Sequence, residues 1–241
     1  MRVLVIQHDH ICLPGAVGER LRERGYVIEL HQVVEADRFD SPNVDTDFPD
    51  PTDFDAIVSL GAPWSAYDHE SIGNWVPREL DLLRRAHEVE IPVLGICFGG
   101  QLLALAHGGE VVKSTAPELG WVGVQSDDEE LVASGPWFQW HYDRWTVPAG
   151  ATEVARNAHA SQAFVYGRNL AVQFHPEMTP AILAAWFETG ATLDIDRFGL
   201  DGSALQGQTR ACDPVNRERA HRLVDAFLDR VATGAAAEAM Q

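Results

Sequence analysis

The most informative segment of the chain reads VLGICFGGQ, from Val93 to Gln101. Its first four residues resemble a short buried strand, and the residues after Cys97 lead into the helical run QLLALAH. Gly95 and Gly99 stand two residues before and two residues after Cys97, a spacing that lets a chain turn sharply from a strand into a helix. The segment therefore predicts a strand-to-helix elbow with Cys97 at its tip.

A cysteine at such an elbow is a candidate nucleophile. The N-terminus of the following helix supplies partial positive charge, which favours the thiolate form of Cys97. The alternative is a buried structural cysteine in a glycine-rich turn, because GxCxG is a short pattern that also occurs by chance.

Upstream of this segment, strands alternate with helices. Pro92 closes a helix whose apolar face carries Leu80, Leu83 and Ala86, and Asn74 is predicted to cap that helix. The other predicted elements are a strand at 2–7, a helix at 15–24 ended by Gly25, a strand at 27–31, a surface loop at 35–52 and a strand at 56–60. This alternation predicts an α/β fold with a mainly parallel, doubly wound sheet.

The second half has a different pattern. Short alternating runs at 119–124, 152–156, 162–166 and 170–174 predict further strands, some of them antiparallel. Apolar residues spaced by three and four predict an amphipathic helix over about 214–232, packed on the sheet or on a partner. Without repeats or a linker, residues 1–241 are predicted to form one domain.

Composition excludes several classes of protein. The 241 residues are 46% hydrophobic and 22% charged, which suits a globular fold, and the net charge of −18 disfavours nucleic acid and anionic membrane as partners. With no apolar run of about 18 residues and no signal peptide, a cytoplasmic protein is expected. Cys12, Cys97 and Cys212 are too few and too widely spaced for a disulfide framework.

A second motif, AVQFHPE at 171–177, places His175 at the end of a strand and Glu177 two residues further on. A cysteine nucleophile needs a base that moves its proton, and the base needs a third group that orients it. His175 and Glu177 can fill these roles, although either residue alone is more often an ordinary surface residue. Their occurrence together with the elbow favours a Cys-His-Glu catalytic triad.

With these motifs the sequence resembles the class I glutamine amidotransferases over about residues 1–188. The resemblance rests on Ser59–Pro63, the elbow, His141-Tyr142-Asp143 and QFHPE, in the family's order. It implies a flavodoxin-like open, mainly parallel sheet with helices on both faces and antiparallel additions. The resemblance is strongest to stand-alone domains like the glutaminase half of GMP synthase, some of which act as γ-glutamyl peptidases.

The resemblance also implies roles for individual residues. Cys97, His175 and Glu177 match the catalytic triad, and the backbone N–H groups of Phe98 and of Ala62, in the Gly61-Ala62 loop, match the oxyanion hole. Gln101 and the backbone around Trp140, His141 and Tyr142 match substrate-binding positions, and the family needs no metal and no cofactor. The family usually has Gly-Gly-Pro where this chain has Gly61-Ala62-Pro63. Because alanine adopts positive φ less readily than glycine, the loop is expected to reach such a conformation less easily.

Other polar and aromatic clusters have simpler interpretations. His8, Asp9, His10 and Cys12 fit no standard zinc spacing, so a solvated loop at the rim of the sheet is expected. Aromatic residues at 137–145 are expected in the core, with one or two exposed, although they could also line an acceptor pocket. His107 is expected at a helix C-terminus, and Cys212 in a polar loop.

Several functions remain open. The first is hydrolysis of the L-glutamine side-chain amide through a γ-glutamyl thioester, with ammonia passed to an acceptor on another chain, such as a synthase, because no SGGxDS or GxxxxGK[ST] phosphate loop is present. The others are a γ-glutamyl peptidase, a non-catalytic glutamine-binding or regulatory protein, and a deglycase-like or chaperone-like protein. Phe98 stands where that last class has a histidine. The oligomeric state is not determined by the sequence.

Overall fold

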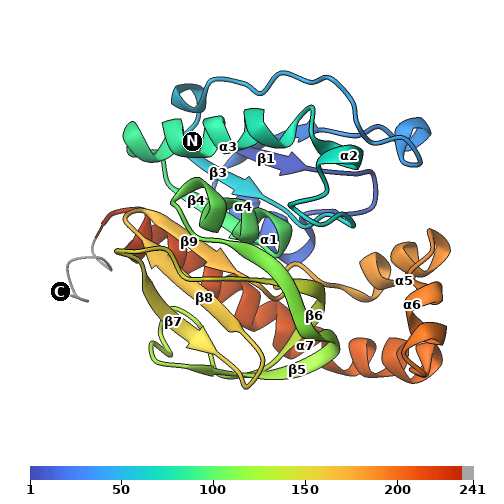
Figure 1. The fold of residues 1–241 in the computed structure, drawn as a ribbon. Coiled ribbons are helices and arrows are strands. Elements are labelled where there is room, and N and C mark those ends of the chain that lie inside the picture. The colour runs from blue at the N-terminus through green and yellow to red at the C-terminus, as the bar shows by residue number, and fades with distance from the viewer. Residues whose placement is uncertain (235–241) are drawn as a thin grey trace.

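The protein is built around a nine-stranded sheet (Figure 1). The computed structural model describes residues 1–234. The strands are β1 (Arg2–Gln7), β2 (Val27–Gln32), β3 (Ala56–Ser59), β4 (Val93–Ile96), β5 (Val111–Ser126), β6 (Gly135–Trp145), β7 (Thr152–Arg156), β8 (Ser161–Tyr166) and β9 (Asn169–Val172). They lie in the order β2-β1-β3-β4-β9-β8-β7-β5-β6.

The first five strands in this order run parallel. Counting β9 as the fifth, their order is that of flavodoxin-like folds, as expected from the sequence. Strands β1, β3, β4 and β9 are almost completely buried because both faces of the sheet are covered. Their carboxyl ends therefore meet at one edge, which is where open α/β sheets bind ligands.

The remaining strands are antiparallel, which confirms the antiparallel strands expected in the second half of the chain. Strand β8 pairs antiparallel with both β9 and β7, and β5 joins β7 to the outermost strand β6. The pairing of β5 with β6 shifts register between Lys113 and Glu118. This irregularity lies beside the segment of β6 that reaches the candidate site.

Helices cover both faces of the sheet, as predicted. Leu223 and Phe227 of the C-terminal helix pack with Val3 and Val5 on one face, whereas Leu83 and Leu103 pack on the other. The helices are α1 (Gly15–Glu23), α2 (His69–Ile72), α3 (Val76–Glu88), α4 (Phe98–Ala106), α5 (Pro180–Glu188), α6 (Thr192–Arg197) and α7 (Gly202–Ala226). Short 3₁₀ turns lie at η1 (Ala36–Arg38) and η2 (Pro51–Asp53), and α7 continues as a π-helical turn, η3 (Phe227–Val231).

Two helix starts differ from the prediction. Asn74 does not cap α3: the N-cap is Trp75, and the amides of Asn74 bond to Asn43 in the preceding loop. Tertiary contact thus overrides the local capping preference. Helix α7 begins at Gly202 rather than near residue 214, and Pro214 lies inside it. The expected apolar stripe of α7 is buried against the sheet of the same chain, which answers the question of what it packs on.

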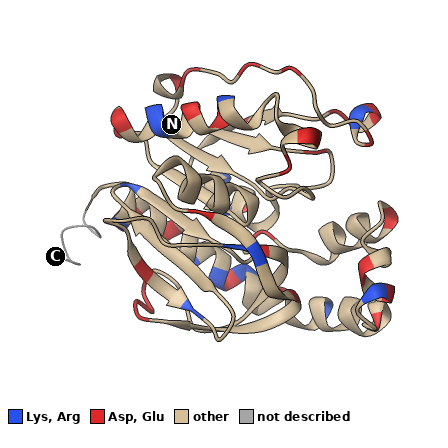
Figure 2. Ribbon diagram, viewed as in Figure 1, with Lys and Arg blue, Asp and Glu red and all other residues tan. Residues whose placement is uncertain are grey.

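Charged residues lie mostly on loops and exposed helix faces. Figure 2 shows acidic segments along the loop that joins β2 to β3. Arginines of neighbouring helices pair with carboxylates: Arg78 of α3 pairs with Asp47 in that loop, and Arg20 of α1 pairs with Asp225 of α7. Of the helices formed within residues 1–234, none has the length and apolar character needed to cross a bilayer.

Candidate active site

Cys97 occupies the turn between β4 and α4 in an unusual backbone conformation. Its φ is +50° and its ψ is −104°, a region that L-residues other than glycine seldom enter. Its N–H donates to the carbonyl of Val172 in β9 at 2.8 Å, which ties the turn to the neighbouring strand. The Cys97 side chain is buried next to the N-terminus of α4.

The two glycines around Cys97 are required by close packing. A Cβ on Gly99 would lie 2.1 Å from the carbonyl oxygen of Ser59, and one on Gly95 would lie 2.6 Å from the carbonyl oxygen of Gly99. The N–H of Gly99 donates to the carbonyl of Leu60 at 3.0 Å. The elbow is therefore pressed against the end of β3, and this explains the glycine spacing of the sequence.

His175 and Glu177 lie together in the turn that follows β9. The distance between His175 Nδ1 and Glu177 Oε1 is 2.6 Å, and both side chains are buried. Burial lowers the pKa of His175, but its interactions with Glu177 and Cys97 outweigh this effect and raise that pKa to about 10. Nothing within residues 1–234 hydrogen-bonds His175 Nε2, so this nitrogen is free for a proton transfer.

Distant segments hold this turn in place. Asn216 of α7 is buried, and its amide nitrogen donates to the carbonyls of Pro176 and Met178, on either side of Glu177. The N–H of Ala16, at the start of α1, donates to the carbonyl of Glu177 at 3.2 Å. No sequence signal pointed to this role of Asn216, because an asparagine inside a helix has no spacing that links it to a turn 40 residues away.

The loop after β3 lies against the same residues. A Cβ on Gly61 would be 3.0 Å from His175 Cε1 and 3.8 Å from Cys97 Cβ. Neither Gly61 nor Ala62 has a positive φ, so alanine at position 62 causes no backbone strain. Within the described chain, the N–H groups of Ala62 and Phe98 make no backbone hydrogen bond. Two amides beside the thiol are thus free to bind a ligand.

A cavity of about 340 Å³ opens over Cys97 and His175, within the size range of small-molecule sites. Gln101, Trp140, His141 and Tyr142, all predicted from the resemblance, lie along its wall. The amide nitrogen of Gln101 is 3.4 Å from Gln173 Oε1, and Gln173 in turn donates to Cys97 Sγ at 3.6 Å. The structure therefore brings the residues expected to bind substrate into one cavity with the thiol and the imidazole.

The ring of His141 makes polar contacts within the fold. Its Nδ1 donates to the backbone carbonyl of Asp143 at 2.9 Å, and its Nε2 lies 3.3 Å from Glu118 Oε2 in β5. Asn157 and Gln162 also donate to Glu118, completing a buried network under β6. The side chain of His141 is thus occupied by contacts within the fold.

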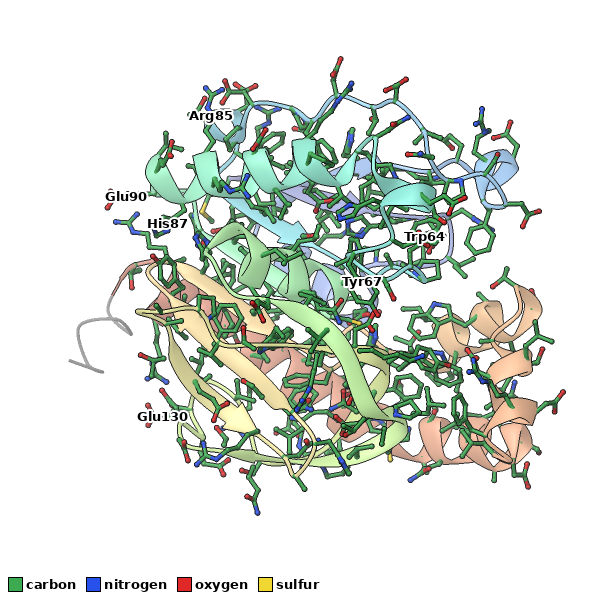
Figure 3. The ribbon with its side chains drawn as sticks, viewed as in Figure 1. Trp64, Tyr67, Arg85, His87, Glu90 and Glu130 are labelled. Carbon is green, nitrogen blue, oxygen red and sulfur yellow. The ribbon has the colours of Figure 1, made fainter. Side chains whose placement is uncertain are left out.

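Other residues of the cavity were missed. The Asp143 carboxylate accepts from Ser65 Oγ at 2.6 Å and from the Tyr67 hydroxyl at 2.7 Å. Trp186 of α5 packs edge-on against the His175 ring, with centroids 5.1 Å apart. Figure 3 shows Trp64 and Tyr67 on the side of the molecule that faces α5 and α6. Asp143 belongs to a motif of the resemblance, but its partners lie 76 and 78 residues away, beyond the reach of spacing arguments.

The segment after β1 corrects one expectation. His8 and Asp9 are fully buried and Cys12 nearly so, which contradicts a solvated rim loop. Asp9 accepts hydrogen bonds from the N–H groups of Ile11 and Cys12 and from the Cys12 thiol. Burial and this carboxylate raise the pKa of Cys12 well above its usual range, so it remains a thiol. No group of three or more metal-binding side chains forms within residues 1–234.

Two further expectations concern residues outside the cavity. His107 follows α4 as predicted, but burial and His87 lower its pKa to about 4, so it stays neutral rather than serving as a cation. Cys212 lies within α7, not in a polar loop. In β6, Trp137, Phe138 and Trp145 are buried in the core, as expected, whereas Trp140 and Tyr142 line the cavity. That this cavity takes an acceptor stays a prediction.

The architecture and the site are those of an open α/β protein with a cysteine at a strained strand-to-helix elbow, beside a histidine–glutamate pair. Residues 15–185 match the sequence profile of the family described as glutamine amidotransferase class-I. The chain belongs to this family of enzymes.

Known relatives agree with this assignment. The chain is 37% identical to a subunit of the glutamine-hydrolyzing GMP synthase of Sulfurisphaera tokodaii over 52% of this chain and 69% of that protein. It is 32% identical to the corresponding subunit from Ignicoccus hospitalis over 54% and 70% of the two chains. A crystal structure of a glutamine amidotransferase from Thermotoga maritima superposes with a TM-score of 0.81 at 26% identity, covering 96% and 98%.

Proposed function

We propose that this protein hydrolyses the side-chain amide of L-glutamine through a covalent intermediate on Cys97. The observation that carries the proposal is the strained Cys97 elbow, with the buried His175–Glu177 pair beside it, at the floor of one cavity. The residues that build the cavity come from both halves of the sheet and from α5, which supports a single catalytic unit for the chain.

In the first half of the reaction the Cys97 thiolate attacks the Cδ atom of glutamine. The N–H groups of Phe98 and Ala62 stabilise the oxyanion of the tetrahedral intermediate, and the loss of one such donor typically costs about 10²–10³ in rate. His175 Nε2 donates its proton to the leaving nitrogen. The C–N bond breaks, ammonia departs, and a γ-glutamyl thioester remains on Cys97.

In the second half water attacks the thioester. His175, now neutral, removes a proton from the water, and the second oxyanion forms between the same two N–H groups. The C–S bond breaks, glutamate is released and Cys97 returns as a thiolate. Glu177 keeps the His175 ring in its productive orientation and stabilises the imidazolium in both halves.

The ammonia is proposed to react on another polypeptide. The two relatives described as GMP synthase subunits support this, because each such chain is one part of a larger enzyme. In single-chain GMP synthases the matching region is a fraction of the protein: for that of Thermosipho melanesiensis it covers 29% of the length. A separate synthase polypeptide is therefore the partner we propose.

One observation favours a second candidate, a γ-glutamyl peptidase with the same triad. Trp186 and Leu193 of the α5–α6 region also line the cavity that holds the thiol. Apolar and aromatic walls of this kind suit a leaving group larger than ammonia. A panel of γ-glutamyl peptides, assayed beside glutamine, separates the two: a much larger kcat/KM for a peptide would replace glutamine as the substrate.

The test is the release of glutamate from L-glutamine by the purified chain, with Cys97→Ala as the control. We expect release that depends on Cys97 and a γ-glutamyl adduct on that residue when the reaction is quenched in acid. Retained release by Cys97→Ala would exclude the mechanism. A thermal shift with glutamine but no release would instead indicate a non-catalytic binding protein.

A further inference from the structure

A buried imidazole stands directly behind the loop that flanks Cys97. His8 follows β1 and is completely buried, as is Glu79 of α3. His8 Nδ1 lies 3.0 Å from the carbonyl oxygen of Gly61, and His8 Nε2 lies 3.0 Å from Glu79 Oε2. The other Glu79 oxygen accepts from the hydroxyl of Ser59 at 2.8 Å. None of these three side chains has a part in the chemistry described above.

The partners of the His8 ring assign its protons. A carbonyl oxygen can only accept a hydrogen bond, so the proton on Nδ1 is assigned as donated to Gly61. Nε2, on the opposite side of the ring, faces the carboxyl group of Glu79. The ring is further held by Trp75, stacked at 5.5 Å, and by Phe98, edge-on at 4.8 Å. His8 is therefore fixed in position and is a donor toward the loop.

The peptide bond between Gly61 and Ala62 links the His8 contact to the orientation of the Ala62 N–H. All peptide bonds within residues 1–234 are trans, and in a trans peptide the C=O and the following N–H point in opposite directions. The Gly61 carbonyl is turned to His8, so the N–H of Ala62 is turned away from it. Ala62 and Cys97 both line the cavity, whereas His8 is not among the residues that line it.

We infer that His8, held by Glu79, is a positioning residue that fixes the Gly61–Ala62 peptide with its N–H toward Cys97. The inference rests on the proposed function, since it assigns the orientation of one of the two proposed oxyanion donors. Without the His8 contact, the peptide loses the hydrogen bond that distinguishes its two orientations. Neither residue of the peptide has a positive φ, so backbone strain does not hold it in place of His8.

The test compares two double variants that differ only in the donor to Gly61. In His8→Asn/Glu79→Gln, the asparagine amide nitrogen can occupy the place of Nδ1 and still donate. In His8→Leu/Glu79→Gln, a side chain of similar shape donates nothing. The Glu79→Gln change in both variants avoids leaving a buried carboxyl group without its His8 partner. We expect the leucine variant to lose about 10²–10³ in kcat relative to the asparagine variant, with little change in KM.

Two controls separate positioning from a merely structural role. Alkylation of Cys97 by iodoacetamide needs the thiolate but forms no oxyanion, so both variants should react at equal rates. The γ-semialdehyde of glutamate forms a tetrahedral adduct on the thiol, so it should inhibit the leucine variant far more weakly. Equal kcat in the two folded variants, or unequal alkylation, would overturn the inference. Absence of glutamate release by the wild-type chain would overturn the proposed function and this inference together, and so marks a different failure.

Discussion

His175 Nδ1 lies 2.6 Å from Glu177 Oε1, although only one residue separates the two in the chain. A strand would point both side chains to the same face, but here the chain leaves β9 at Val172 and turns at Pro176. The turn folds Glu177 back onto the imidazole, and Asn216 holds the carbonyls on either side of it. The orientation of the His175 ring is thus set by a local turn that a distant helix keeps closed.

Replacing Glu177 with glutamine should lower the rate and move its pH dependence. The negative charge of Glu177 helps to raise the pKa of His175 to about 10, so the imidazolium that protonates the leaving nitrogen persists up to that pH. Without the charge this pKa falls toward the ordinary imidazole value of about 6.5. We expect kcat to fall on the order of 10²–10⁴ and the alkaline limb of the pH–rate profile to move to lower pH.

The matched control is Glu88→Gln, a change at an exposed position of α3. It should leave both the rate and the profile unchanged. An alkaline limb that stays in place in Glu177→Gln would show that Glu177 does not set the charge state of His175.

Gly99→Ala and Gly207→Ala are expected to change stability in opposite directions. Both glycines are helical, but a Cβ at Gly99 would lie 2.1 Å from the Ser59 carbonyl, whereas one at Gly207 meets nothing within 4 Å. Overpacking of this kind costs about 1–3 kcal/mol, and alanine in an open helix position gains roughly 0.5–1 kcal/mol. Denaturant unfolding measures both, and equal effects would contradict the tight contact between the elbow and β3.

Asp143→Asn should weaken substrate binding. The Asp143 carboxylate lines the cavity and is held by Ser65 and Tyr67, and it can accept a hydrogen bond from the α-ammonium group of a γ-glutamyl substrate. Hydrogen bonds to charged groups contribute about 1.5–3 kcal/mol, so KM should rise roughly tenfold or more. Asp47→Asn, at a 99% exposed side chain, is the control, and an unchanged KM for Asp143→Asn would remove it from the binding site.

Phe227→Ala should show that the C-terminal helical segment belongs to the main core. Phe227 is fully buried with Val3 and Val5 of β1, and truncation of a buried phenylalanine costs about 3–5 kcal/mol. Val215→Ala, at a residue that is 52% exposed, should change the free energy of unfolding by less than about 0.5 kcal/mol. A small effect at Phe227, or a separate unfolding step, would indicate that α7 and η3 are not part of the cooperative unit.

Elements and candidate site residues that depend on local spacing could be predicted from the sequence. The glycines around Cys97 predict the elbow because their steric role acts within a few residues, and the stripe of α7 is readable because helical periodicity is local. The parallel direction of the first strands follows from alternating elements, since a parallel connection needs a crossover helix. Cys97, His175 and Glu177 were all named from motifs of this kind.

Contacts between distant side chains, in contrast, depend on the tertiary structure. His8 hydrogen-bonds to Gly61 and Glu79, which are 53 and 71 residues away along the chain. Asp143 hydrogen-bonds to Ser65, which is 78 residues away. Long-range contacts also explain two predictions that were wrong. Asn74 bonds to Asn43 instead of capping α3, and His8 and Asp9 are buried rather than solvated. The carboxyl ends of β1, β3, β4 and β9 converge only when the sheet forms. Which polar groups lose water and must pair is therefore a property of the assembled sheet, not of any one segment.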